Sequence, residues 1–133
     1  MRLSVELIDL QPSQLYLNRN KLRTLIMEGF QAEEIESDPL PVIKYNGELV
    51  LIDGHTKAFL ADQQGVKNIT VKYLAEVDHL NMYQKNVNLC KQEEITLIRD
   101  LAKQIIPHED FERQWVQKHK STTASNKGIQ NDQ

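Results

Sequence analysis

Five consecutive residues, Asp53-Gly54-His55-Thr56-Lys57, bring together side chains that bind anions, bind metal ions or transfer protons. Gly54 lets a ligand approach the backbone, and the first N–H groups of a helix attract anions because they lack internal partners. Thr56 adds a hydroxyl donor, and Lys57 adds positive charge for a phosphate. Asp53 suits a metal ion or a substrate proton, and His55 suits acid–base chemistry or hydrogen bonding. The segment predicts a ligand-binding turn.

The same residues also have structural interpretations. Asp53 can be the N-cap of the helix that follows, because its carboxylate can accept a backbone N–H. Gly54 can simply shape the turn, and Lys57 can point into water. The spacing of the five residues does not decide between a binding site and a structural turn.

The elements on either side of the turn are clearer. Asn46-Gly47 predicts a tight hairpin, because both residues accept positive φ. The uninterrupted apolar run at residues 49–52 is typical of a strand covered on both faces. A short helical segment then ends at Gly65, which fits the left-handed position after a helix. The alternation of residues 69–73 predicts another strand, so the strand–helix–strand order favours a right-handed crossover.

The preceding residues predict a strand, a break and a helix. Residues 3–7 alternate as in a strand, and Pro12 favours a turn or the first turn of a short helix. A helix is predicted in residues 20–30, where Leu22, Leu25 and Ile26 have helical spacing, with Asn18 or Asn20 as its cap. The acidic stretch from Glu28 to Asp38 contains no Lys or Arg, and we interpret it as a loop.

The residues after 75 have helical spacing. One apolar stripe contains Leu80, Tyr83, Val87 and Cys90, and a buried, inert thiol is expected for Cys90. A second stripe covers residues 97–105, with Thr96 as its predicted N-cap. A third helix is predicted after Pro107, with Glu109 and Arg113 at ion-pair spacing. We therefore expect an α/β core at residues 1–75, a helical extension packed on it at 76–119, and a disordered tail at 120–133.

Composition excludes some classes of protein. The formal net charge of -3 gives no basic excess for nucleic acid. A single cysteine excludes an intrachain disulfide, and no cluster has zinc-finger spacing. No apolar run is long enough to span a membrane, and no signal peptide is recognised, so a cytoplasmic protein is expected.

The stretch "PLPVIKYNGELVLIDGHTKAFLADQQGVKNITVKYL" resembles the core of the ParB/sulfiredoxin-like superfamily. The likeness covers about residues 1–75 and is specific over residues 40–73. It implies an α/β (α+β) fold with a small mixed sheet, a hairpin and a βαβ unit, followed by C-terminal helices. In that superfamily this turn binds nucleotide phosphates.

The turn is most similar to the Asp-Gly-His-His-Arg of the free-serine kinases, where the acidic residue takes part in phosphoryl transfer. Thr56 replaces the second histidine, and Lys57 replaces the arginine, which gives up bidentate phosphate recognition. His55 stands where sulfiredoxin has its reactive cysteine, which argues against sulfiredoxin chemistry. The arginine-rich second motif of ParB is absent.

The leading hypothesis is therefore a domain that binds a nucleotide or another phosphorylated ligand at the Asp53–Lys57 turn, with phosphotransferase or nucleotide hydrolase activity left open. Asp53 and His55 would be catalytic, and Asp53 would hold Mg²⁺ that accompanies ATP, ADP or CTP. Gly54, His55, Thr56 and Lys57 would contact the ligand. The alternative hypothesis is a non-enzymatic module that binds protein or nucleic acid, in which the turn is structural.

Overall fold

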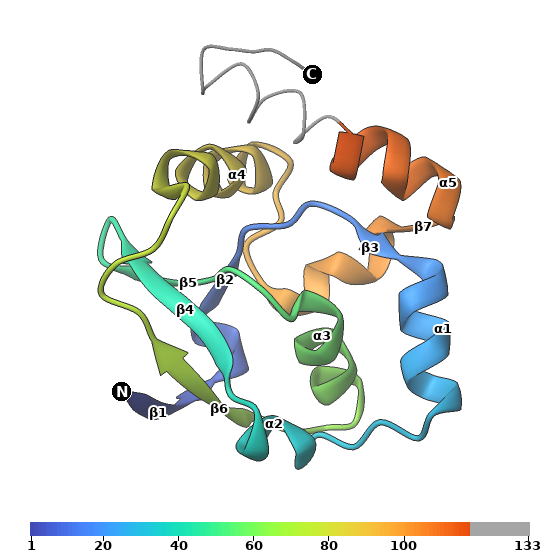
Figure 1. Ribbon diagram of the computed structural model, residues 1–133, viewed down its shortest axis with the longest axis horizontal. Coiled ribbons are helices and arrows are strands. Elements are labelled where there is room, and N and C mark those ends of the chain that lie inside the picture. The colour runs from blue at the N-terminus through green and yellow to red at the C-terminus, as the bar shows by residue number, and fades with distance from the viewer. Residues whose placement is uncertain (118–133) are drawn as a thin grey trace.

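A five-stranded mixed sheet forms the centre of the computed structural model, which describes residues 1–117 (Figure 1). Its strand order is β1-β6-β4-β5-β2, and a separate two-stranded sheet pairs β3 with β7. The fold class predicted from the sequence is confirmed. The strands are β1 (Arg2–Glu6), β2 (Leu10–Pro12), β3 (Leu17–Asn18), β4 (Leu40–Tyr45), β5 (Glu48–Leu51), β6 (Asn68–Tyr73) and β7 (Ile105–Ile106).

In the view of Figure 1, α4 lies above this sheet and α2 below it, and α3 lies near the middle of the fold, between the sheet and α1. No helix within residues 1–117 is long and apolar enough to cross a membrane. The α-helices are α1 (Arg19–Met27), α2 (Glu34–Ser37), α3 (His55–Gln63), α4 (Leu80–Gln92) and α5 (His108–Phe111). The 3₁₀ helices are η1 (Leu7–Asp9) and η2 (Ile98–Gln104), and the π-helical turn η3 spans Glu112–Val116.

The β4–β5 hairpin confirms the prediction made from its turn residues. Asn46 and Gly47 have φ angles of 52° and 78°, and Tyr45 pairs with Glu48 across the turn. Strand β5 is covered on both faces, as its apolar run indicated. Leu51 belongs to the main hydrophobic cluster, and Val50 belongs to a smaller one with Val87 of α4.

Helix α3 also begins and ends close to where the sequence placed it. Gly65 has a φ of +84°, and the next N–H, that of Val66, donates to the Ala61 carbonyl at 3.1 Å. The crossover differs from the prediction in one respect. Strand β6 is parallel to β4, not to β5, and β4 lies between them. The connection between the parallel strands β4 and β6 therefore consists of β5, which forms a hairpin with β4, followed by α3.

The N-terminal segment contains a strand that the sequence did not reveal. Pro12 was expected in a turn or helix, but it is the last residue of β2, where it pairs with Leu51 of β5. Because β2 is an edge strand, the missing N–H of proline is tolerated there. Helix α1 is confirmed, with the Asn18 side chain accepting the Asn20 N–H at 2.9 Å. The acidic stretch is not all loop, because it contains α2.

Two details of the C-terminal helices also differ from the sequence predictions. Thr96 is not an N-cap, because η2 begins after Leu97, and the Asp100 carboxylate accepts the N–H groups of Thr96 and Leu97. Arg113 pairs with Asp110, one turn back, and not with Glu109. The tail predicted to be disordered, residues 120–133, lies outside the described residues.

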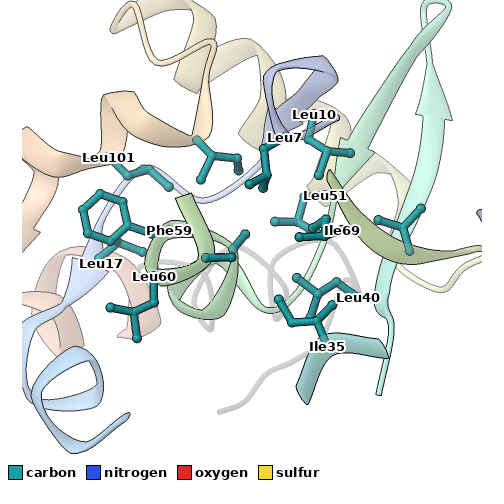
Figure 2. Close-up of a cluster of buried hydrophobic side chains, with 14 of the residues drawn as sticks. Leu7, Leu10, Leu17, Ile35, Leu40, Leu51, Phe59, Leu60, Ile69 and Leu101 are labelled. Carbon is teal, nitrogen blue, oxygen red and sulfur yellow. The ribbon is translucent and has the colours of Figure 1, made fainter. Parts of the chain in front are cut away.

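One hydrophobic cluster joins the N-terminal and C-terminal segments (Figure 2). Leu51 and Phe59 contribute to it from the first 75 residues, and Leu101 and Trp115 contribute from the helical extension. Trp115 meets the Tyr16 ring edge to face, with centroids 6.3 Å apart. Cys90 is fully buried in the same cluster, and burial raises the pKa of its thiol to about 12.

Candidate functional site

The turn between β5 and α3 depends on glycine at position 54. Gly54 has a φ of +81°, and a Cβ atom there would lie 2.5 Å from Cδ2 of Leu40. The first backbone hydrogen bond of α3 runs from the Ala58 N–H to the Gly54 carbonyl at 2.9 Å. The N–H groups of His55, Thr56 and Lys57 precede that bond and have no acceptor within the helix. The turn therefore presents the positive end of α3.

Asp53 is exposed at the end of β5, and its Oδ1 accepts the Gly54 N–H at 2.8 Å. The predicted N-cap role of Asp53 is wrong, because the N-cap is Gly54 and no side chain caps this helix. Tyr83 of α4 and Ile52, the residue before Asp53, pack against the same small hydrophobic cluster, so the helical extension borders the turn. Burial raises the pKa of the Tyr83 hydroxyl, and the Asp53 charge raises it further.

A cavity of about 220 Å³ opens beside the turn. Three of the residues predicted from the sequence line it, namely Asp53, Gly54 and Lys57. Two further lysines join them from distant elements, Lys21 of α1 and Lys72 of β6. The remaining lining residues come from the segment that enters β4: Asp38, Pro39, Leu40 and Pro41. Three lysines and two aspartates in one cavity, at a helix N-terminus, give a site with an excess of positive potential.

Two of the predicted site residues do not line this cavity. His55 and Thr56 are buried, with 2% and 3% of their surface exposed, and neither lines the cavity. They follow the turn on the first turn of α3, where their side chains lie in the protein interior. Only their backbone N–H groups belong to the open end of the helix.

The surroundings of His55 do not suit the acid–base role predicted for it. The Ser13 N–H donates to Nε2 of the ring at 3.0 Å, and Nδ1 is buried without a hydrogen-bond partner among the described residues. Burial lowers the pKa of His55 from 6.5 to about 3, and the positive charge of Lys21 contributes. The ring is therefore neutral at pH 7, and its accepting nitrogen is already occupied. These contacts make His55 a structural residue of the turn.

No sequence pattern predicted that Lys21, Asp38 or Lys72 would belong to the site. Lys21 and Lys72 are exposed lysines in a predicted helix and a predicted strand, where a charge usually marks a solvated face. Asp38 ends the acidic stretch, which offered several candidate acids and no motif to choose among them. Its position just before Pro39 and Pro41, at the start of β4, is what brings it to the turn.

The carboxylates of Asp38 and Asp53 are the metal ligands that the cavity offers. Mg²⁺ commonly binds through one or two carboxylates together with substrate phosphates and water. No group of three or more His, Cys, Asp or Glu side chains gathers into a metal site within residues 1–117. Within the described residues, the cavity therefore offers a metal ion these two carboxylates and no third side chain of these kinds.

Comparison with known proteins gives likenesses of structure only. No family model matches the sequence, and no curated protein matches it. The fold is similar to that of protein Atu1540 from Agrobacterium tumefaciens, with 15% identity, a TM-score of 0.45, and coverage of 72% of this chain and 49% of Atu1540. It is also similar to sulfiredoxin from Arabidopsis thaliana, with 16% identity, a TM-score of 0.46, and coverage of 63% of this chain and 97% of sulfiredoxin.

Sulfiredoxin belongs to the superfamily that the sequence around the turn resembles. The mixed sheet and its helices are those expected from that resemblance. The chain spans about half the length of Atu1540.

Proposed function

We propose that the cavity beside Gly54 binds the phosphate groups of a nucleotide or of another phosphorylated ligand. The observation that carries this proposal is the meeting of Lys21, Lys57 and Lys72 at the N-terminus of α3. The three lysines come from three separate elements, so their convergence does not follow from any local pattern. Lysines and free helix N–H groups are the usual partners of phosphate in proteins.

The size of the cavity limits which part of the ligand it holds. Pockets that enclose a whole small molecule usually measure about 300–1,000 Å³, and this one measures about 220 Å³. We therefore assign the phosphate groups to the cavity and leave the rest of the ligand outside it. In this arrangement the backbone of residues 54–57 and the three lysine ammonium groups contact the phosphate oxygens.

The two carboxylates of the cavity make phosphate binding there dependent on a metal ion. Asp38 and Asp53 would repel a bare phosphate, but Mg²⁺ between them and the phosphate would remove that repulsion. When bound, the metal supplies charge neutralisation to the phosphate oxygens. Phosphotransfer or hydrolysis at this site would assign Asp53 as the base that accepts a proton from the attacking substrate hydroxyl or, in hydrolysis, from the attacking water.

A ligand screen by thermal shift tests the proposal. Pyrophosphate, ATP, ADP, CTP and GTP are added to the protein with and without Mg²⁺. A ligand at about 100 times its dissociation constant should stabilise the protein by about 2.7 kcal/mol. Pyrophosphate and the nucleotides should stabilise the protein to a similar extent if the cavity contacts only their phosphate groups.

Matched lysine variants then locate the binding. Lys57→Ala should weaken binding by about tenfold or more, because it removes a charge-assisted contact. Lys85→Ala is the control, since Lys85 is an exposed lysine on a helix and does not line the cavity. Equal affinities of the two variants would place the ligand elsewhere. If no phosphate compound stabilises the wild-type protein at millimolar concentration, the turn is structural and the interaction-module hypothesis takes its place.

A further inference from the structure

Strand β1 leaves one edge of the five-stranded sheet open. It pairs with β6 on one side, and no strand within residues 1–117 pairs with its other side. Four of its five residues are exposed, and Val5 is partly buried. An exposed edge of this kind is a template for another strand, unless the sequence prevents pairing.

The hydrogen bonds to β6 determine which groups of β1 point outward. The Leu7 N–H donates to the Lys67 carbonyl at 2.8 Å, and the Tyr73 N–H donates to the Met1 carbonyl at 2.7 Å. Both bonds lie in the register that pairs Leu3 with Val71. In an antiparallel ladder, hydrogen-bonded and non-bonded residues alternate. The odd-numbered residues of β1 therefore bond to β6, and Arg2, Ser4 and Glu6 direct their N–H and C=O groups to the open edge.

The sequence of this edge is complementary to itself. When two copies of Arg-Leu-Ser-Val-Glu run antiparallel about Ser4, Arg2 of each copy lies opposite Glu6 of the other, and Leu3 lies opposite Val5. The outward-facing residues then face each other, so the backbone groups of Arg2, Ser4 and Glu6 all find partners. Opposite charges in cross-strand positions are favourable, and like charges are unfavourable. The charges that usually protect an edge strand would here attract a second copy.

We propose that β1 is a self-association edge, where two copies of this chain pair their sheets antiparallel about a two-fold axis at Ser4. A two-fold contact of one surface with itself is the commonest arrangement of soluble homo-oligomers. Leu3 and Val5 lie opposite the buried residues Val71 and Ile69 of β6. The pairing would extend this apolar face across the two copies.

One existing contact bears on Arg2. Its Nη1 donates to the Glu36 carbonyl at 3.3 Å in an exposed bond. An arginine has five N–H donors, so the guanidinium can keep this bond and still reach Glu6 of a second copy. Pairing over so short a strand buries little surface, so the dimer should be weak.

Sedimentation equilibrium of the full chain without an N-terminal tag tests the proposal. Across about 10 μM to 1 mM protein the wild type should pass from monomer to dimer. Arg2→Glu places an acidic residue opposite Glu6 in both cross-strand pairs, and it should weaken the dimer by about tenfold. Glu6→Arg places two basic residues opposite each other in both pairs and should have the same effect. The double variant Arg2→Glu/Glu6→Arg restores opposite charges in this register and should regain the wild-type constant.

A backbone variant provides a second measurement. Ser4→Pro removes an outward N–H and leaves the ladder to β6 intact, so it should abolish the dimer without unfolding the sheet. Lys103→Glu is the control for charge change, since Lys103 is exposed and lies in η2, outside the five-stranded sheet. A wild type that stays monomeric at 1 mM overturns the proposal. So does a dimer that survives Ser4→Pro, or a double variant that fails to recover.

Discussion

The Ser13 N–H donates a hydrogen bond of 3.0 Å to Nε2 of His55, which ties the end of β2 to the first turn of α3. The Ser13 hydroxyl donates to the Leu51 carbonyl at 2.6 Å, just before the turn. One serine therefore holds both sides of the turn, which fixes the backbone at the mouth of the cavity. Because Nε2 accepts a hydrogen bond, the proton of the neutral ring is on Nδ1.

Replacing His55 should destabilise the protein. His55→Ala leaves the buried Ser13 N–H without an acceptor and leaves a cavity, and the two effects together should cost about 2–4 kcal/mol. Urea unfolding measures this cost. His108→Ala is the comparison, because His108 is exposed and its one side-chain hydrogen bond, accepted by Nδ1 from the Asn18 amide, lies at the surface, so its loss should cost no more than about 1 kcal/mol. A His55→Ala protein of wild-type stability would show that the hydrogen bond contributes nothing.

The same residue should make stability depend on pH. The pKa of His55 is about 3 in the folded protein, against 6.5 ordinarily, so between these values the unfolded chain binds a proton that the folded chain does not. Stability should be complete above pH 6.5 and fall by about 1.4 kcal/mol per pH unit as the pH drops towards 3. Urea unfolding of the wild type and of His55→Gln at a series of pH values isolates the effect, since the carboxylates contribute equally to both proteins. The prediction is contradicted if the free energy of unfolding depends on pH with the same slope in both.

Gly54→Ala should destabilise the protein by more than the strain of a left-handed backbone alone would cause. The new Cβ would meet Leu40 Cδ2 at 2.5 Å in addition to the strain at a φ of +81°. We expect a loss of about 2–4 kcal/mol, because the strain and the overpacking add. Gly65→Ala is the matched control at the other end of α3, with a φ of +84° and open space around it.

The control should lose only about 1–2 kcal/mol. Thermal and urea unfolding of both variants give the comparison. Equal losses would show that Leu40 moves aside at no cost and that the turn has room for a side chain.

Asp53→Asn should separate anion binding from metal-dependent binding. Without Mg²⁺, removing the negative charge should leave the affinity for pyrophosphate unchanged or raise it by a few fold. With Mg²⁺, the variant should bind ATP more weakly and lose any turnover, because the metal ligand or base is gone. Calorimetry with and without Mg²⁺, combined with a phosphate-release assay, measures both effects.

Asp38→Asn provides the companion experiment. If Asp38 and Asp53 share one magnesium ion, either substitution should weaken the Mg²⁺-dependent binding, and the double variant should lose little more. Glu34→Gln is the control, as an exposed acid of the same stretch that does not line the cavity. Additive losses from Asp38 and Asp53 would mean that the two carboxylates act separately.

The sequence by itself determined the local elements around the turn. Asn46 and Gly47 specify a hairpin because few other residues accept positive φ there, and Gly65 ends α3 for the same reason. The apolar run of β5 indicated burial on both faces, and the structure confirms it. These predictions succeeded because the physical cause lies within a few residues of its effect.

Only the tertiary structure decided which residues share the cavity. Lys21, Asp38 and Lys72 lie 15 or more residues from Asp53 in the sequence, and they meet the turn because α1, β4 and β6 pack around α3. The same packing buries His55 beside Ser13. Ser13 follows the edge strand β2, which was not predicted from the sequence because it ends in Pro12. Contacts between distant segments depend on the packing of whole elements, and no local pattern of residues records them.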